Sequence, residues 1–208
     1  MTPTTHGITG TPWPHEKDAA PGYAKHRKED VTYEMDPVDA AKRVLAFGCP
    51  RTVITGGEPL LQESAFLEMI ATIREQDPDH QFEVETNGTR IPSADFYTAV
   101  NQFNVSPKLA NSGMPESLRL SSGALGFFAS SPKSWFKFVA NDSINLLEIS
   151  ELCSKIGIPR QRVLLMPEGR TSRELDRFSA QLAELCRDQG FRFCDRLHIR
   201  LWGDRRGV

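Results

Sequence analysis

Short runs of β-branched and aromatic residues alternate with amphipathic helical patterns along most of this chain, and that alternation limits its fold more than any other feature. The runs predict strands at residues 51–55, 82–86, 103–106, 135–140 and 163–166, and a last extended segment at about 191–202. Strands joined by short helical connections run parallel, with right-handed crossovers. The sequence therefore predicts an α/β fold, either a partial β/α barrel or a small doubly wound sheet. In both folds, ligands gather where strands end and helices begin.

Several of the predicted helices carry recognisable end signals. The pair Asp36–Pro37 is typical of an N-cap and first helical turn, and the helix that it opens ends at Gly48. A later helix begins with the capping-box pattern of Thr171–Glu174 and ends near Gly190. Other helical patterns cover residues 66–73, 93–100 and 146–156.

The N-terminal part differs from the rest of the chain. Residues 1–30 are rich in proline, glycine and charged residues and have no apolar period, which predicts an irregular segment. The 208-residue chain of 23.3 kDa is long enough for one domain with a buried core. We therefore expect a single α/β domain at residues 31–208.

Composition argues against several classes of function. The net charge is −2, from 25 basic and 27 acidic residues, so nothing indicates a nucleic-acid groove or a membrane surface. No apolar run approaches the roughly 20 residues of a membrane-spanning helix, and no signal-peptide pattern opens the chain. A cytoplasmic protein that binds neither nucleic acid nor membrane is expected.

Cysteine is sparse and scattered. Cys49, Cys153, Cys186 and Cys194 show no C-x2-C or C-x3-C spacing, so they form no cluster or metal motif. We expect all four to be small apolar side chains.

Polar motifs follow the first two predicted strands. Thr55–Pro59 reads TGGEP, in which Gly56 and Gly57 allow a sharp turn with exposed backbone groups and Glu58 can accept hydrogen bonds from an ammonium group. At the end of the second strand, Glu85 can bind ribose hydroxyls and is followed by Thr86-Asn87-Gly88. A plain turn without a ligand is the alternative for both segments.

Two further motifs follow later strands. Ser106–Lys108 reads SPK, and Lys108 could reach a carboxylate as a point charge, although a solvated lysine is the simpler interpretation. After the fifth strand, Glu168 and Arg170 add a carboxylate and a guanidinium next to the capping residue Thr171.

The C-terminal segment is unusual for a tail. Residues 197–208, LHIRLWGDRRGV, combine His198 and Trp202 with three arginines and end on Val208. The segment is either tied down, with the Val208 α-carboxylate as an acceptor, or a solvated basic tail.

The order TGGEP, ETNG, VSPK, VLLMPEGRT and LHIRLWGDRRGV resembles the 7-carboxy-7-deazaguanine synthases of the radical S-adenosylmethionine (SAM) superfamily. The likeness covers about residues 31–208. It implies a partial β/α barrel that works as a homodimer, with a [4Fe–4S] cluster held by a C-x3-C-x2-C loop, SAM and Mg²⁺. It also implies a carbon–nitrogen lyase reaction that turns 6-carboxy-5,6,7,8-tetrahydropterin into 7-carboxy-7-deazaguanine and ammonia for queuosine or other 7-deazapurines. A flavodoxin- or ferredoxin-type reductant would supply the electron that cleaves SAM to a 5′-deoxyadenosyl radical.

The resemblance assigns roles by motif. For SAM, the matched residues are Gly56, Gly57, Glu58, Glu85, Asn87, Ser106 and Lys108. Thr55, His198 and the Val208 carboxylate would face the pterin, and Thr2 would be the Mg²⁺ residue left from the family's CDT-P stretch.

The chain departs from the family pattern at the cluster. The C-x3-C-x2-C loop and the earlier LQGEG segment with its arginine are absent from the 208 residues. Either the true start lies upstream, which we favour because the other ligand motifs are intact, or the protein is a noncatalytic SAM- or pterin-binding relative or a decayed, inactive fragment. Without the family's first strand, the strand at 51–55 is predicted to have an open edge, and the isolated chain is predicted to assemble no cluster.

A barrel lyase or aldolase is the alternative from another class. It would use Lys108 or Lys137 as a Schiff base, which requires a desolvated lysine. The simpler interpretation of Lys137 is a strand lysine that points to the outer face.

Overall fold

A computed structural model describes residues 33–140 and 143–205. The described chain divides into two compact units, with the boundary inside the third strand. The N-terminal unit comprises residues 33–86 and 90–103, and the C-terminal unit comprises residues 87–89, 104–140 and 143–205. The expectation of a single domain stays a prediction.

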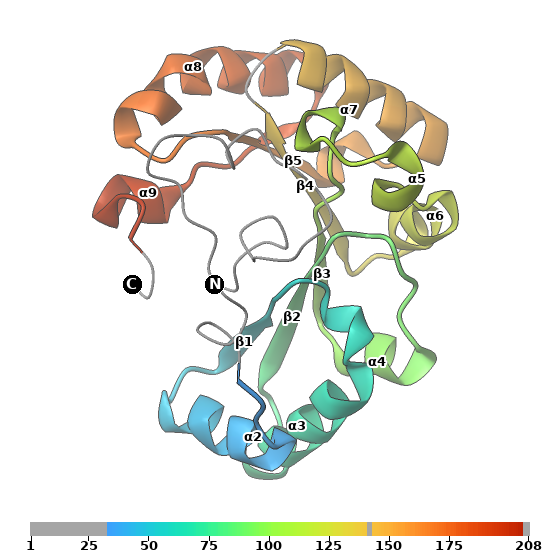
Figure 1. The fold of residues 1–208 in the computed structure, drawn as a ribbon, viewed down its shortest axis with the longest axis vertical. Coiled ribbons are helices and arrows are strands. Elements are labelled where there is room, and N and C mark those ends of the chain that lie inside the picture. Colours follow the sequence, from blue (N-terminus) through green and yellow to red (C-terminus); the bar gives the residue numbers. More distant parts are fainter. Residues whose placement is uncertain (1–32, 141–142, 206–208) are drawn as a thin grey trace. The chain divides into compact units, whose positions relative to one another are not determined.

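The N-terminal unit contains two strands, their helices and the start of a third strand (Figure 1). Its elements are α2 (Pro37–Ala46), β1 (Arg51–Ile54), the 3-10 turn η3 (Pro59–Leu61), α3 (Glu63–Gln76), β2 (Gln81–Thr86), α4 (Ala94–Ala99) and the first half of β3 (Gln102–Val105). Helices α2 and α3 lie side by side below β1 and β2 in Figure 1. Strands β1 and β2 pair in parallel, with Ile54 opposite Val84.

The C-terminal unit carries the remaining strands. Its elements are η4 (Ala110–Ser112), α5 (Glu116–Arg119), α6 (Ser122–Ser130), β4 (Ser134–Ala140), α7 (Ser143–Ile156), η5 (Arg160–Arg162), β5 (Val163–Pro167), α8 (Ser172–Gln189), β6 (Arg192–Phe193) and α9 (Leu197–Trp202). Strands β4 and β5 pair in parallel, as do β5 and β6. Helices α7 and α8 pack against β4 and β5.

The strand order decides between the two folds that the sequence left open. It follows the chain, β1-β2-β3-β4-β5-β6, with β1 at one end. A doubly wound sheet reverses its order at a switch point, whereas the strands of a β/α barrel are added in sequence. The prediction of an α/β fold of the partial-barrel type is therefore confirmed, and among the described strands β1 is an edge strand as expected.

Alternation of burial gives β2, β3, β4 and β5 a core face and a more polar face. Phe82 and Val84 of β2 and Phe136 and Phe138 of β4 are fully buried, while the residues between them, such as Glu83, are half-buried. The strands were predicted from runs of β-branched and aromatic residues, and this period of two follows from the alternation of side chains along a strand.

The buried His80 fixes the start of β2. Its Nε2 lies 2.8 Å from Thr52 Oγ1 and its Nδ1 lies 2.9 Å from Asp77 Oδ2. Its ring is tilted by 39° against that of Phe82, with the ring centroids 4.9 Å apart. Both ring nitrogens are thus satisfied at the end of the strands away from the polar motifs.

The helix-end predictions are confirmed. The Asp36 side chain accepts a hydrogen bond from Val38 N, and the Thr171 side chain accepts one from Glu174 N. Gly190 ends α8 in the left-handed conformation.

Two parts of the secondary structure differ from prediction. Helices α5 and α6 lie in a segment where no element was predicted. The extended segment at 191–202 is wrong beyond Phe193, because residues 197–202 form α9. The alternating pattern of LHIRLW suits a strand, but only Ile199 is buried, and Gly203 N closes the helix on Ile199 O at 2.9 Å.

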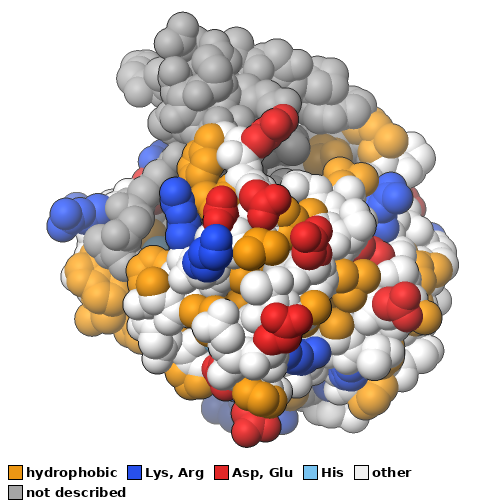
Figure 2. Space-filling model, turned by 90° about the horizontal axis from the view of Figure 1, so that it is seen from below, with side chains coloured by type: hydrophobic (Ala, Val, Ile, Leu, Met, Phe, Trp, Pro, Cys, Tyr) orange, Lys and Arg blue, Asp and Glu red, His pale blue; other side chains and the backbone are white. Residues whose placement is uncertain are grey.

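On the face shown in Figure 2, acidic and basic side chains are interspersed with apolar ones. Among the described helices, none combines the length and the apolar character needed to cross a bilayer.

Candidate functional site

The turn after β1 holds its acidic residue in a buried position. The carboxylate of Glu58 accepts hydrogen bonds at Oε1 from Leu60 N, at 3.2 Å, and from Thr86 Oγ1, at 2.8 Å. Both Glu58 and Thr86 are nearly inaccessible to solvent. The Glu58 side chain therefore caps η3 and ties the TGGEP turn to the last residue of β2.

Thr55 and Glu85 lie side by side. They follow Ile54 and Val84, which are paired in the parallel register, and Thr55 Oγ1 donates to Glu85 Oε2 at 3.3 Å. The N-terminal unit thus pairs Thr55 with Glu85 and joins Glu58 to Thr86, the residue after Glu85. Gly56 and Gly57 lie in the turn between Thr55 and Glu58.

The residues after β2 form a tight turn in the C-terminal unit. Asn87 Oδ1 accepts hydrogen bonds from Thr89 N at 2.9 Å and Thr89 Oγ1 at 2.6 Å. Gly88 has φ +75°, and a Cβ atom there would lie 2.7 Å from Val105 Cγ1 and 2.9 Å from Leu125 Cδ2. Only glycine fits this backbone and this space. Gly88, which follows Asn87, thus packs against Val105, which precedes Ser106.

Lys108 is exposed on a loop whose neighbouring residues are buried. Pro107 and Leu109 are both buried, and Ser106 is half-buried. Two side chains from other elements hold the backbone around Lys108. Arg119 Nη1 donates to Lys108 O at 3.0 Å, and Glu148 accepts from Ala110 N. Sequence reasoning missed both, since neither belongs to a local motif.

The segment after β5 serves mainly to cap α8. Glu174 Oε2 accepts from Arg170 N at 2.7 Å, so the carboxylate reaches one residue further than in the usual capping box. This hydrogen bond is the main cause that lowers the pKa of Glu174. The Arg170 side chain pairs with Asp204 beyond α9. The predicted guanidinium at this strand end is thus engaged in an ion pair.

Ion pairs tie the described part of the C-terminal segment to its unit. Arg200 donates from Nε to Asp195 Oδ2 at 2.6 Å and from Nη1 to Asp176 Oδ1 at 2.5 Å on α8. Hydrogen bonds from Arg200 to Asp176 and Asp195 raise its pKa. Arg196 Nη1 donates to Gly169 O at 2.9 Å. His198 is half-buried on the helix held in this way, whereas Val208 and Thr2 lie outside the described residues.

The four cysteines are free thiols that differ in exposure. Cys49 is exposed, Cys194 is half-buried, and Cys153 and Cys186 are buried, which raises the pKa of each of these last two thiols to about 11. Within residues 33–140 and 143–205, no group of three or more His, Cys, Asp or Glu side chains is placed to hold a metal ion.

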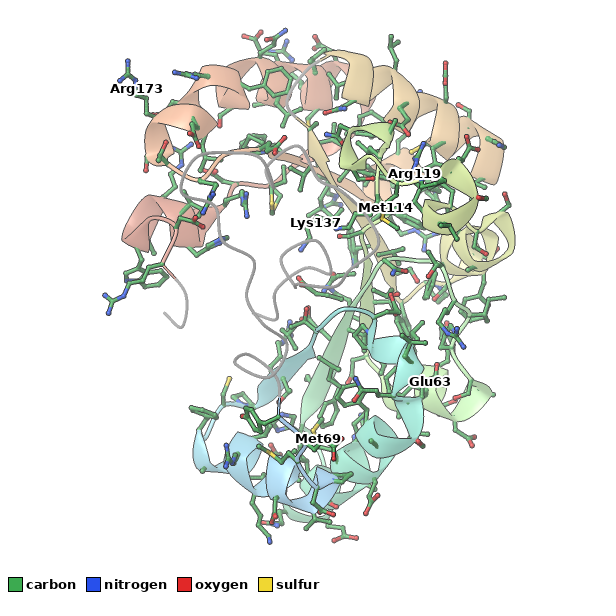
Figure 3. The ribbon with its side chains drawn as sticks, in the orientation of Figure 1. Glu63, Met69, Met114, Arg119, Lys137 and Arg173 are labelled. Carbon is green, nitrogen blue, oxygen red and sulfur yellow. The ribbon has the colours of Figure 1, made fainter. Side chains whose placement is uncertain are left out.

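Lys137 lies on the face of β4 opposite Phe136 and Phe138 (Figure 3). It is half-buried, and its charge acts on the Cys194 thiol, whose pKa is raised by burial and lowered in smaller part by Lys137. The lysine side chain therefore does not enter the phenylalanine core. The Schiff-base alternative stays a prediction.

The known proteins to which this chain is similar share one name. No family model matches the chain. A protein of Pyrobaculum aerophilum named 7-carboxy-7-deazaguanine synthase is 37% identical over 176 residues, which cover 84% of this chain and 75% of that protein. Proteins of the same name from Halobacterium salinarum and Rhodopirellula baltica are 31% and 28% identical, cover 88% and 89% of this chain, and are each matched over 74% of their length.

Proposed function

Because this chain belongs to the 7-carboxy-7-deazaguanine synthase family, we propose that it binds SAM and 6-carboxy-5,6,7,8-tetrahydropterin and forms 7-carboxy-7-deazaguanine with release of ammonia. The observation that carries the proposal is the 37% identity over 84% of the chain. This is a radical SAM reaction of the carbon–nitrogen lyase class. We further propose that the protein is cytoplasmic, acts as a homodimer and receives electrons from a flavodoxin- or ferredoxin-type protein.

The acids of the N-terminal unit support the nucleotide part of the proposal. We assign Glu58 and the adjacent glycines to the methionyl end of SAM, because a carboxylate fixed by Thr86 and Leu60 keeps one geometry toward an ammonium group. Glu85 would accept hydrogen bonds from the ribose hydroxyls. Asn87, Ser106 and Lys108 complete the assigned residues, with Lys108 as the cation for a carboxylate.

The pterin is assigned to Thr55, His198 and the Val208 carboxylate. The hydroxyl of Thr55 bonds to Glu85, so its orientation is set by the residue assigned to the nucleotide. The half-buried His198 can donate or accept a hydrogen bond at its ring nitrogens, and the Val208 α-carboxylate would accept hydrogen bonds from the N–H groups of a pterin ring. Thr2 remains the residue proposed for Mg²⁺.

The thiols of this chain do not fit the [4Fe–4S] cluster of the radical SAM reaction. A cluster needs several thiolates converging on one site, but Cys153 and Cys186 lie on separate helices, α7 and α8, in surroundings that keep them protonated. No step of the reaction is therefore derived through cysteines of these 208 residues.

Calorimetric titration of the purified chain with SAM tests the proposal. Replacing Glu85 by Gln removes a charged acceptor and is expected to weaken SAM binding about 10- to 100-fold. Glu83→Gln is the matched control, because Glu83 lies on the same face of β2 and pairs with Arg51 instead. It should leave SAM affinity unchanged.

A second titration addresses the pterin. Thr55→Val keeps the shape of the side chain, and we expect it to weaken binding of 6-carboxy-5,6,7,8-tetrahydropterin more than binding of SAM. The proposal is wrong if the wild-type chain takes up neither compound, or if Glu83→Gln and Glu85→Gln weaken SAM binding equally.

A further inference from the structure

We propose that Arg119 and Glu148, together called the clamp, position Lys108 for the carboxylate of the nucleotide, an inference that rests on the proposed function. The clamp joins α5 and α7 to the loop after β3, and Figure 3 shows Arg119 beside these two helices. Arg119 Nη1 donates to Glu148 Oε1 at 2.7 Å and to Lys108 O at 3.0 Å. Ala110 N lies 3.1 Å and 3.0 Å from the two carboxylate oxygens of Glu148.

Burial makes the clamp rigid. The side chain of Arg119 is 7% exposed and that of Glu148 is 22% exposed. Arg119 Nε is buried and has no hydrogen-bond partner among the residues that the structure describes. A desolvated guanidinium of this kind depends on the carboxylate beside it, because an unpaired buried charge is strongly unfavourable. The pair therefore holds one geometry.

The clamp acts on the backbone on both sides of the Lys108 side chain. One member binds the carbonyl group of Lys108, and the other binds the amide of Ala110, two residues later. Pro107 restricts φ before Lys108, and Leu109 is buried after it. The Cα atom of Lys108 is thus fixed while its long side chain extends from an exposed position. A fixed origin reduces the conformational freedom that the side chain loses when it binds an anion.

A second ion pair between the same helices provides a matched control. Lys155 of α7 and Glu116 of α5 lie 3.8 Å apart, with side chains 67% and 65% exposed. This pair joins the helices as the clamp does, but no hydrogen bond from it to the loop after β3 is found in the described chain. Its removal should test helix packing without moving Lys108.

The experiment is a double-mutant cycle on the full chain. Affinity is measured for SAM and for 5′-methylthioadenosine, which lacks the amino-acid carboxylate. Glu148→Gln and Arg119→Met are each expected to weaken SAM binding about tenfold, while 5′-methylthioadenosine binding changes less than about twofold. In the Lys108→Ala background, the same changes should weaken SAM binding no further. Lys155→Met should change neither affinity.

The outcomes separate the clamp from the proposed function. If the wild-type chain binds no SAM, the proposed function fails. If it binds SAM but Lys108→Ala has no effect, or the clamp variants weaken both ligands equally or add to Lys108→Ala, the clamp inference alone is overturned. Thermal unfolding identifies any variant that does not fold. If Arg119→Met does not fold, the double-mutant cycle is interpreted from Glu148→Gln, which is nearly isosteric with the wild-type side chain.

Discussion

The turn after β1 and the loop after β3 occupy the same topological position, but they are held in different ways. In the first, the candidate ligand residue Glu58 is itself the anchor, because its carboxylate binds Thr86 and Leu60 N. In the second, the candidate ligand residue Lys108 is exposed, and the clamp anchors its backbone. Folding and ligand binding are therefore combined in one side chain in the first case and divided between several in the second.

This difference determines how substitutions can be interpreted. A change at Glu58 alters stability and any binding together, so a loss of affinity there has two causes. A change at Lys108 should alter binding alone. Substitution of Glu58 is thus expected to lower stability and affinity together, whereas substitution of Lys108 is expected to lower affinity without lowering stability.

The largest effect is expected at Glu58. Glu58→Ala leaves the buried Thr86 hydroxyl and the Leu60 amide without their acceptor, and we expect the free energy of unfolding to fall by about 2–4 kcal/mol. Urea denaturation followed by circular dichroism measures this change. Glu68→Ala, at an exposed position on α3, should change stability by less than about 0.5 kcal/mol. Equal effects of the two variants would show that Glu58 does not anchor the turn after β1.

The turn after β2 shows a third way of holding a strand end, by close packing. Gly88→Ala would place a methyl group 2.7 Å from Val105 Cγ1 with φ at +75°, and we expect a loss of about 2–3 kcal/mol. Gly48→Ala has a similar φ of +63° but nothing within 4 Å, so only the backbone strain of about 1 kcal/mol should remain. The difference, measured by denaturation, isolates the packing contribution. Equal losses would show that packing does not hold this turn.

Local features of the fold could be predicted from the sequence because their causes are local. The caps at Asp36 and Thr171 involve neighbouring residues, and the strands are runs of β-branched and aromatic residues. Helix α6 was missed because Gly123 and Gly126 lower helix propensity, whereas burial of Leu125 and Phe128 overrides it.

The candidate site could be predicted in part, for the same reason. The strand-end motifs at Glu58, Glu85 and Lys108 can be read along the chain. The clamp could not, because Arg119 and Glu148 are 29 residues apart and meet only through tertiary packing. The sequence therefore indicated which side chains present themselves at the strand ends but not which ones hold them there.

Alkaline pH should affect the unit that carries the loop after β3. Cys153 and Cys186, both of the C-terminal unit, have pKa values raised by burial to about 11, from 9.0. Because the folded thiols stay neutral while the unfolded ones ionise, this contribution to stability is complete below pH 9 and is lost as the pH rises toward 11. We expect a loss on the order of 1 kcal/mol per thiol between pH 8 and pH 10.

Thermal unfolding of wild type and Cys186→Ala at both pH values measures the contribution of this thiol. The variant should lose less stability on going to pH 10. Cys49→Ala, which changes the exposed thiol of the N-terminal unit, should keep the wild-type dependence. An identical pH dependence in all three proteins would contradict the prediction.

The smallest effect on stability is expected at Lys108, and it is the sharpest test of the comparison. Lys108 is exposed, and the clamp binds its carbonyl group, a contact that Lys108→Ala leaves in place. The free energy of unfolding should therefore change by less than about 0.5 kcal/mol, as for Lys42→Ala on the exposed side of α2. A loss above about 1 kcal/mol in urea denaturation would show that the lysine side chain is itself an anchor. The loop after β3 would then resemble the turn after β1, because its candidate ligand residue would also be the residue that anchors it.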